Sequence, residues 1–309
     1  MGVGRGYGKL LLFGEHAAVY GHPAVGLRLE EYLEVELVAP REGNRQDAAA
    51  APAEWVLPPL EPREAELVQN ALDALPVRVT PGELRIHGTL PMSVGFGSSA
   101  AFCTALLCAA GFGGDRLELW AEAHRLEHVF HGTPSGIDTG LSVFPGASVV
   151  YPDPPGLPSR EPAALPRAWL VFGAIPRTSS TAALVAGVRS LRERDSTRVE
   201  RTLHRLGELS RLAATPARCP DAGALGAFAD EAQQRLRALG LSTSELDSVL
   251  DFLRESGAAG AKLSGAGGGG AFYGVFETEE AASDAVSLAR QALPRSVTLL
   301  HLGVVAPST

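Results

Sequence analysis

Two glycine-rich segments have the residue types and spacing best suited to chemistry. They are Gly95-Phe-Gly-Ser-Ser-Ala100 and Gly265-Ala-Gly-Gly-Gly-Gly270, the second preceded by Lys262 and followed by an apolar stretch. Glycines let the backbone approach a ligand closely, and free N–H groups at a helix start bind anions. A tight turn before a buried helix is the alternative for the first segment. Two phosphate-facing turns in one chain indicate a triphosphate.

Both segments also satisfy the dinucleotide pattern G-x-G-x-x-G/A. That pattern belongs between a strand and its helix in repeating βαβ units, with an acidic residue about 20 positions later. Asp115 and Glu118 nearly meet the acidic requirement after the first segment, but the repeating units are missing. A Walker P-loop is excluded as well, because Gly8-Lys9 is followed by Leu10.

A zinc hydrolase is an alternative interpretation, because His124-Arg-Leu-Glu127-His128 matches the inverted zinc-protease motif H-x-x-E-H. The two imidazoles would lie one helical turn apart, with Glu127 as the base. A third zinc ligand should follow downstream in such a protease, but nothing in the sequence singles out a residue as this ligand. The motif also leaves both glycine segments unexplained.

Apolar periodicity predicts the elements that must position these segments. Strands are expected at residues 9–13, 31–37, 83–90, 168–175, 271–276 and 296–304, with a further strand just before the second glycine segment. Helices are expected at residues 62–75, 98–110, 115–130, 181–214 (more than one), 221–239, 244–255 and 279–293. Residues 41–59 are predicted to be a loop, and residues 131–136 a turn. For the second half, helices covering one face of a mixed sheet are the economical packing.

A chain of 309 residues exceeds the size at which one hydrophobic core stops growing, so two domains are expected. The segment from Pro152 to Pro166 holds six prolines in fifteen residues, which is typical of a domain boundary. We therefore predict domains at residues 1–165 and 166–309.

Composition describes an ordinary soluble globular protein, with 45% hydrophobic and 20% charged residues. The formal net charge of −8 argues against nucleic acid or anionic lipid as a partner. The chain has no apolar run long enough to span a membrane and no signal peptide, so the cytoplasm is the expected location. The three cysteines, Cys103, Cys108 and Cys219, lack C-x-x-C spacing and are expected to be buried packing residues.

Three segments in order resemble the signature motifs of the galactokinase, homoserine, mevalonate and phosphomevalonate kinase (GHMP) superfamily. They are Gly8-Lys-Leu-Leu-Leu-Phe-Gly-Glu-His-Ala-Ala-Val-Tyr-Gly21, Pro91 to Ala101, and Lys262 to Gly270. Two further stretches, His131-Gly-Thr-Pro-Ser-Gly-Ile-Asp138 and Pro176 to Arg189, resemble the mevalonate kinases in particular. The resemblance covers nearly the whole chain.

This resemblance implies an α+β, two-domain GHMP kinase fold. The N-terminal domain would be like domain 2 of ribosomal protein S5, and the C-terminal domain would be ferredoxin-like. The implied reaction transfers the γ-phosphoryl of ATP to the 5-hydroxyl of mevalonate with Mg²⁺ as cofactor. ATP and mevalonate are the implied partners, and a homodimer is compatible with the family. The alternatives are phosphomevalonate kinase, mevalonate 3-kinase, and a non-catalytic ligand sensor on the same scaffold.

The sequence departs from the family pattern at three places. Gly6-Tyr7 stands where Ala-Pro is usual, Phe96 replaces a usual Leu, and Thr139-Gly140 follows the aspartate where Asn-Ala is common. These departures bear on fine details of substrate binding, while the motifs that define the reaction are retained.

The resemblance also assigns roles in binding ATP and metal. The nucleotide phosphates would be held by Gly95, Gly97, Ser98, Ser99, Ala100, Gly265 and Gly267. The Ser99 hydroxyl and the Glu127 carboxylate would reach Mg²⁺, which prefers oxygen ligands. Glu127 lies eleven residues before Asp138, the spacing of the two acidic residues in mevalonate kinases; a solvated helix glutamate is the alternative.

Asp138 would accept the proton of the substrate hydroxyl, and Lys9 would pair with it, lower the pKa of the attacking hydroxyl and offset phosphate charge. Glu15, His16 and Thr181 match family positions that face the acceptor. A hydrogen-bonded structural histidine is the alternative for His16, because a lone histidine seldom declares its role.

Overall fold

The computed structural model describes residues 2–39, 54–153, 156–294 and 296–305. Packing divides the chain into two compact units. The first unit comprises residues 1–9, 28–91 and 97–145. The second unit comprises residues 10–27, 92–96 and 146–309. Strands β1 (Val3–Phe13) and β2 (Ala24–Val38) each contribute residues to both units.

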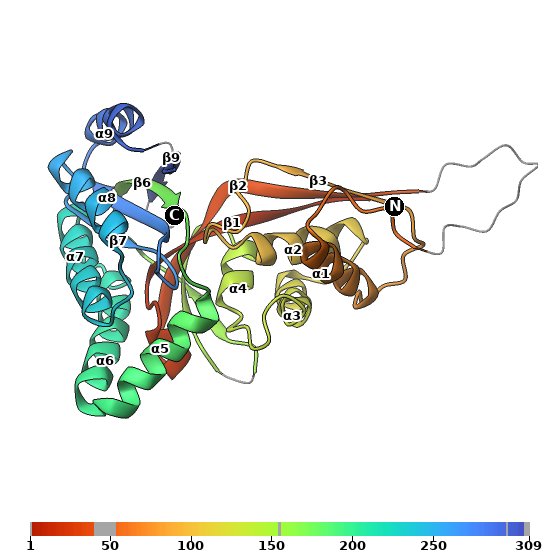
Figure 1. Ribbon diagram of the computed structural model, residues 1–309, viewed down its shortest axis with the longest axis horizontal. Coiled ribbons are helices and arrows are strands. Elements are labelled where there is room, and N and C mark those ends of the chain that lie inside the picture. The colour runs from red at the N-terminus through yellow and green to blue at the C-terminus, as the bar shows by residue number, and fades with distance from the viewer. Residues whose placement is uncertain (1, 40–53, 154–155, 295, 306–309) are drawn as a thin grey trace, which may run out of the picture. The chain divides into compact units, whose positions relative to one another are not determined.

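Among its described residues, the first unit combines parts of three strands, β1, β2 and β3, with four helices. Strand β3 (Glu83–Gly88) pairs antiparallel with residues 33–38 of β2. The helices are α1 (Pro62–Asp73), α2 (Ser98–Ala109), α3 (Arg116–Glu127) and α4 (Ile137–Val143). Figure 1 shows α2, α3 and α4 gathered together, and each of them packs on the other two.

Helix α2 lies directly on strand β1 because alternate positions of that strand are glycine. A Cβ atom on Gly4 would overlap the carbonyl oxygen of Ala105, and one on Gly6 would overlap that of Ala101. Glycine in a strand often marks such a close backbone approach. The departure from the family pattern at Gly6 therefore has a packing reason, and it fixes the start of α2 relative to β1.

Helices α3 and α4 are held by local hydrogen bonds. Asp115 and Glu118 form a capping box at the start of α3, which satisfies backbone N–H groups there. The buried Trp120 on α3 donates from its indole nitrogen to the Gly136 carbonyl, 2.9 Å away, immediately before α4. This contact ties the beginning of α4 to α3.

The second unit is built on a four-stranded sheet in the order β7-β8-β6-β9, with every neighbouring pair antiparallel. The strands are β6 (Ala168–Ile175), β7 (Gly260–Leu263), β8 (Gly270–Phe276) and β9 (Thr298–Val305). Helices α5 (Thr181–Arg194), α6 (Ser196–Ala213), α7 (Ala222–Ala238) and α8 (Ser244–Glu255) connect β6 to β7, and α9 (Glu279–Ala292) connects β8 to β9. This is the β-α-β-β-α-β order of a ferredoxin-like domain.

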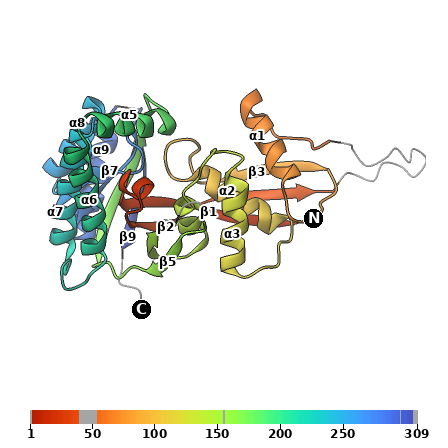
Figure 2. The same cartoon turned by 90° about the horizontal axis from the view of Figure 1, so that it is seen from below.

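Smaller elements complete the second unit. They are the 3₁₀ helix η1 (Ala17–Tyr20) and strands β4 (Ala147–Tyr151) and β5 (Ser159–Pro162). Strand β4 pairs with residues 24–27 of β2 and with β5. Helices α6 and α7 lie side by side in both views (Figure 1, Figure 2).

The predicted strands and helices are present, and the structure corrects five details. The second sheet is antiparallel rather than mixed. A helix that was not predicted, α4, begins directly after the predicted turn at residues 131–136, so Asp138 lies in the first turn of a helix. The proline-rich segment contains strand β5, and neither strand β4 nor the short helix η1 was predicted.

Two predictions about chain organisation remain open. Most of the predicted loop at residues 41–59 lies outside the described residues. Residues 146–165 pack with the second unit, whereas the predicted domain boundary falls at residues 165/166; that boundary stays a prediction. Within the described ranges, no helix is both long and apolar enough to cross a membrane.

Candidate active site

The structure brings together Lys9 and Asp138, the two residues predicted to be catalytic. The Lys9 Nζ atom on β1 lies 3.0 Å from Asp138 Oδ1 on α4. The Lys9 side chain is 5% exposed, whereas that of Asp138 is 37% exposed. A buried cation therefore supports a carboxylate that solvent, or a ligand, can reach. The catalytic roles themselves stay predictions.

The start of α2 passes directly over the Lys9 side chain. Gly97, the residue before the helix, has a φ of 74°, and a Cβ atom there would lie 2.8 Å from Lys9 Cγ. Only glycine adopts this conformation readily in so little space. The N-cap residue makes no side-chain hydrogen bond to the start of α2, and backbone N–H groups in the first turn of a helix can bind an anion.

Glu127 ends α3 as a buried carboxyl in the same unit. Its residue is 2% exposed, and burial together with the negative charge of Asp138 raises its pKa to about 8, although Lys9 and a hydrogen bond from Ser99 act in the opposite direction. A cation beside these two carboxylates would relieve both effects. Glu127 and the Ser99 hydroxyl therefore fit a divalent metal.

His131 joins this cluster although the sequence analysis gave it no role. Its Nε2 atom lies 3.2 Å from the Ser99 hydroxyl oxygen, within hydrogen-bond distance. The residue opens the stretch that resembles mevalonate kinases, and this was the only signal for it. His131 can therefore fix the direction in which the Ser99 hydroxyl points.

The two histidines of the H-x-x-E-H segment lie against each other in the structure. The His124 and His128 rings meet edge to face at 5.1 Å, and His128 Nδ1 donates to the His124 carbonyl at 3.1 Å. Among the residues that the structure describes, no group of three or more His, Cys, Asp or Glu side chains is arranged to hold a metal ion.

In the second unit, Lys262 pairs with Glu15 in the interior. Lys262 Nζ donates to Glu15 Oε1, and both side chains are fully enclosed. Lys262 also donates to the Leu263 carbonyl at 2.6 Å, with the Tyr273 ring 5.4 Å away. From the sequence, Lys262 was predicted to support a phosphate-facing turn. In the structure the Lys262 ammonium group points away from solvent and pairs with the buried Glu15 carboxylate instead.

His16 is held by the second glycine segment. Its Nε2 atom lies 2.9 Å from the Ala266 carbonyl, so this nitrogen carries the proton and donates. The backbone φ is 56°, unusual for a non-glycine residue, and burial lowers the pKa of the imidazole. The structural alternative for His16 thus has a specific partner, and the substrate roles of Glu15 and His16 stay predictions.

Further contacts join the same two segments. The Ser264 hydroxyl donates to the Leu11 carbonyl at 2.8 Å and accepts from the Leu11 N–H at 3.1 Å. The Tyr273 hydroxyl donates to the Leu12 carbonyl at 2.7 Å. These hydrogen bonds therefore hold residues 11–16 against residues 262–273, the stretch that contains the second glycine segment.

Replacing Lys262 with methionine is expected to lower the free energy of unfolding by about 3–5 kcal/mol at neutral pH, because the Glu15 carboxylate is left buried without its counter-ion. Burial raises the pKa of Glu15 above its ordinary value. A raised carboxyl pKa stabilises the folded state below the unfolded pKa, and this stability is lost as pH rises through the folded pKa. The loss in Lys262→Met should therefore be largest near about pH 8 and shrink toward about pH 5.

Urea unfolding of the wild type and Lys262→Met across this range measures the effect. The double variant Glu15→Gln/Lys262→Met is the matched control, since it removes the unpaired charge, and should recover much of the stability. A loss that is the same at every pH would contradict a buried charge as its cause.

The second glycine segment adopts a backbone that suits glycine alone. Gly265 and Gly267 have φ angles of 86° and 83°, and a Cβ on Gly267 would overlap the Leu241 carbonyl.

Thr181, the predicted acceptor contact, begins α5 and accepts a hydrogen bond from Arg177 Nη1 at 3.3 Å. Phe96, a departure from the family pattern, packs edge to face on Phe172 with ring centroids 5.9 Å apart.

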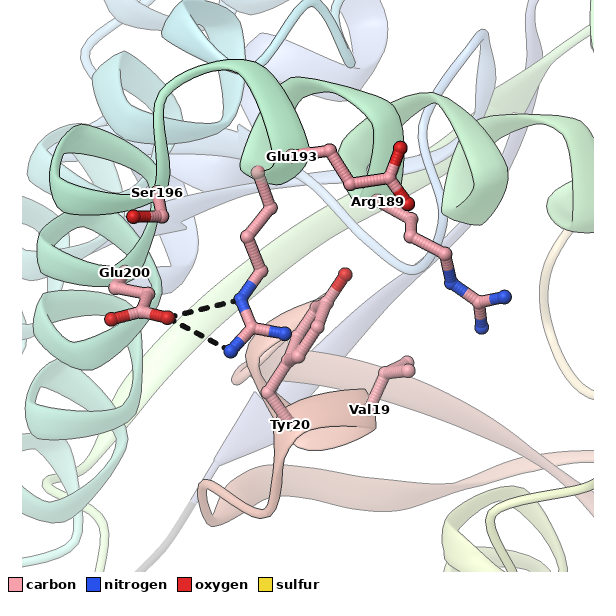
Figure 3. A pocket seen from close by; sticks show the side chains of 7 residues that line it. Val19, Tyr20, Arg189, Glu193, Ser196 and Glu200 are labelled. Carbon is pink, nitrogen blue, oxygen red and sulfur yellow. Dashed lines mark hydrogen bonds and ion pairs between the residues drawn. The ribbon is translucent and has the colours of Figure 1, made fainter.

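A separate pocket of about 490 Å³ opens between η1, α5 and the start of α6 (Figure 3). Arg192 there donates to Glu200 at 2.8 Å and lies over the Tyr20 ring, 5.1 Å from its centroid. None of the predicted site residues lines this pocket.

Comparison with protein families now places the chain. Residues 65–146 match the profile described as the GHMP kinases N terminal domain, and residues 190–294 match GHMP kinases C terminal. One relative, from Archaeoglobus fulgidus, is 33% identical over 278 residues, which span 88% of this chain and 92% of the relative. The chain therefore belongs to the GHMP kinases, a family of ATP-dependent kinases, and this excludes the zinc hydrolase reading.

Two relatives within the family carry the name mevalonate kinase, as the sequence resemblance predicted. The Archaeoglobus fulgidus protein carries this name, as does one from Methanothermobacter thermautotrophicus that is 31% identical over 85% of this chain and 86% of its own length. The crystal structure of L. major mevalonate kinase in complex with R-mevalonate superposes with a TM-score of 0.82 at 26% identity, covering 100% of this chain and 97% of that one. The predicted two-domain GHMP kinase fold is confirmed.

Proposed function

We propose that this protein is a mevalonate kinase that transfers the γ-phosphoryl of ATP to the 5-hydroxyl of mevalonate. The observation that most supports the proposal is the Lys9–Asp138 pair beside the start of α2. The pair provides a proton acceptor next to a helix end that can bind an anion. Relatives named mevalonate kinase match this chain over most of their length.

In the proposed reaction, the 5-hydroxyl oxygen forms a bond to the γ-phosphorus while the bond between that phosphorus and the bridging oxygen of ADP breaks. Asp138 receives the hydroxyl proton. Lys9 holds Asp138 in place and offsets negative charge as it spreads over the transferring oxygens. The N–H groups of Gly97, Ser98, Ser99 and Ala100 hold the phosphates, and Gly95, Gly265 and Gly267 allow the backbone to approach them.

The proposed cofactor is Mg²⁺, held by the Ser99 hydroxyl and the Glu127 carboxylate together with phosphate oxygens. When bound, the metal neutralises charge on the phosphates during transfer. His131 orients the Ser99 hydroxyl from its position 3.2 Å away. In this proposal Glu15, His16 and Thr181 shape the acceptor side.

Replacing Glu127 with glutamine is expected to raise the Mg²⁺ concentration for half-maximal rate by about tenfold or more, because a charged ligand is lost while an amide oxygen remains. Titration of initial rate with MgCl₂ at fixed total ATP measures this. Glu122→Gln on the same helix, whose carboxylate pairs with Arg125 at the surface, is the matched control. If Glu127→Gln needs no more Mg²⁺ than Glu122→Gln does, Glu127 is not a metal ligand.

We also propose a cytoplasmic location, with ATP and mevalonate as small-molecule partners and neither nucleic acid nor membrane as a partner. A homodimer is proposed from the family resemblance alone. Sedimentation of the purified chain tests the dimer.

A coupled ADP-release assay with saturating MgATP tests the function. Mevalonate, phosphomevalonate, galactose and homoserine are compared as acceptors by kcat/KM. A site that hydrogen-bonds its substrate can reject analogues by roughly 10⁴ to 10⁵, so mevalonate should lead by a wide margin. Preference for phosphomevalonate would move the chain to another GHMP kinase. The absence of ADP release with every alcohol would favour a ligand sensor.

A further inference from the structure

The loop that joins α7 to α8, residues 239–243, lies directly beneath the second glycine segment. The Gly268 N–H donates to the Leu241 carbonyl at 2.8 Å, and a Cβ atom on Gly267 would overlap the same oxygen. Leu241 is buried, and its own N–H donates to the Leu236 carbonyl near the end of α7. Helices α7 and α8 both pack against β7, the strand that leads into the glycine segment (Figure 1). The segment therefore rests on a loop that is itself fixed to a helix.

Gln233 on α7 connects this loop to the strand that precedes the glycine segment. The residue is 4% exposed, so its amide group needs partners within the protein. The Oε1 atom accepts from the Leu263 N–H at the end of β7, at 3.0 Å. The Nε2 atom donates to the Ser242 hydroxyl, also at 3.0 Å. One buried side chain thus holds both the start of the glycine segment and the loop beneath it.

The direction of each hydrogen bond in this chain of contacts is fixed. A backbone N–H can only donate, so the amide oxygen of Gln233 faces Leu263 and the amide nitrogen faces Ser242. The Ser242 hydroxyl donates in turn to Asp247 Oδ1 at 2.7 Å, and Asp247 Oδ2 pairs with Arg237 at 3.2 Å. An apolar side chain at position 233 would break the chain at both of its contacts, and a carboxylate would break it at Ser242.

The glycine segment has little intrinsic preference for the shape it adopts. Gly265 and residues 267–270 all have positive φ angles, and glycine loses more conformational freedom on ordering than any other residue. A binding loop that must order when its ligand arrives loses affinity, because the ordering opposes binding. Contacts at Leu263 and Leu241 order this segment before any ligand binds.

We propose that Gln233 is a positioning residue for ATP binding. By holding Leu263 and Ser242 at a fixed separation, it keeps Gly265 and Gly267 in the shape that receives the phosphates. The inference rests on the proposed function, in which these glycines allow the backbone to approach ATP. Gln233 acts through the glycine segment and does not itself contact a substrate.

Gln233→Leu is expected to weaken the binding of a non-hydrolysable ATP analogue, measured by calorimetry, by about 5- to 50-fold, because two buried hydrogen bonds are lost. KM for MgATP should rise by a similar factor. At saturating MgATP kcat should stay within about threefold, since bound ATP orders the segment again. Gln234→Leu is the matched control, because Gln234 is the next residue on α7 and is exposed, and it should leave all three values unchanged.

Gln233→Glu provides a readout that a packing role would not change. The introduced carboxylate can accept from Leu263 but cannot donate to Ser242, and it lies beside Asp247, whose Oδ1 atom is 3.5 Å from Gln233 Nε2. Burial and this negative charge should raise the pKa of the introduced group, which regains a donor when it is protonated. The loss of ATP affinity relative to wild type should be about tenfold near about pH 8 and shrink to within about threefold near about pH 6. Gln233→Leu should show no such pH dependence.

Ser242→Ala breaks the same chain at its other end, so adding it to Gln233→Leu should weaken ATP binding by less than about a further twofold. The proposal is overturned if Gln233→Leu binds the analogue as well as Gln234→Leu does and only its melting temperature falls. A Gln233→Glu deficit that is equal at every pH is also contrary to it. Should Gln233→Leu not fold, unchanged affinity in Ser242→Ala overturns the proposal. A wild type that binds the analogue without turning over mevalonate would contradict the proposed function alone.

Discussion

Asp138→Asn is expected to lower kcat by about 10² to 10⁴-fold while ATP affinity stays within a few-fold. The substitution keeps the size of the side chain and removes its ability to accept a proton. It leaves untouched the helix end and the glycine turns that are proposed to hold ATP. Steady-state kinetics with mevalonate, together with calorimetric binding of an ATP analogue, separate the two effects.

Asp73→Asn is the control for this experiment, because Asp73 is an exposed carboxylate on α1 that accepts a hydrogen bond from Gln69 at 2.9 Å. It should retain wild-type kcat. Near-normal turnover by Asp138→Asn would remove the proton acceptor from the account, and a parallel loss of ATP affinity would indicate a general disturbance of the site.

Lys9→Met is expected to lower kcat by about 10² to 10³-fold, the usual range for removing one preorganised electrostatic contact to developing charge. Methionine fills similar space beneath Gly97, so the packing at the start of α2 should survive. Thermal melting checks this, because a fall in kcat without a large fall in melting temperature isolates the loss of charge.

The double variant Lys9→Met/Asp138→Asn decides whether the pair acts as one unit. The Nζ to Oδ1 distance of 3.0 Å predicts strong coupling, so the double variant should be little slower than the worse single variant. Effects that multiply would show that the ammonium and the carboxylate act independently, contrary to the contact.

Helices and strands were predicted well wherever the hydrophobic pattern continued without interruption along the whole element. Strand β6 and helix α8 begin and end at the predicted residues. Helix α4 was missed because it has only seven residues and follows Pro134-Ser135-Gly136, whose turn chemistry dominates the local pattern. Strand β5 was missed because it lies in a proline-rich stretch, and its pairing with β4 depends on a partner elsewhere in the chain.

The site was predictable where spacing along the chain carries the chemistry. The glycine turns were identified in this way, and the resemblance to the GHMP kinases pointed to Glu127 and Asp138, whose roles stay predictions. The Glu15–Lys262 pair was not, because its partners are 247 positions apart and only the tertiary fold brings them together. The same holds for Gln233, whose partner Leu263 lies 30 positions away in sequence.

The measurement that tests the central claim most directly is proton-coupled phosphorus NMR of the product formed from mevalonate and MgATP. Phosphate on the primary 5-hydroxyl is next to a CH₂ group, so the account predicts a triplet that appears together with ADP. Transfer to the tertiary 3-hydroxyl would give a singlet, because the carbon that bears the ester has no hydrogen. A singlet, or ADP release with free phosphate and no ester, would contradict the assignment as a mevalonate 5-kinase.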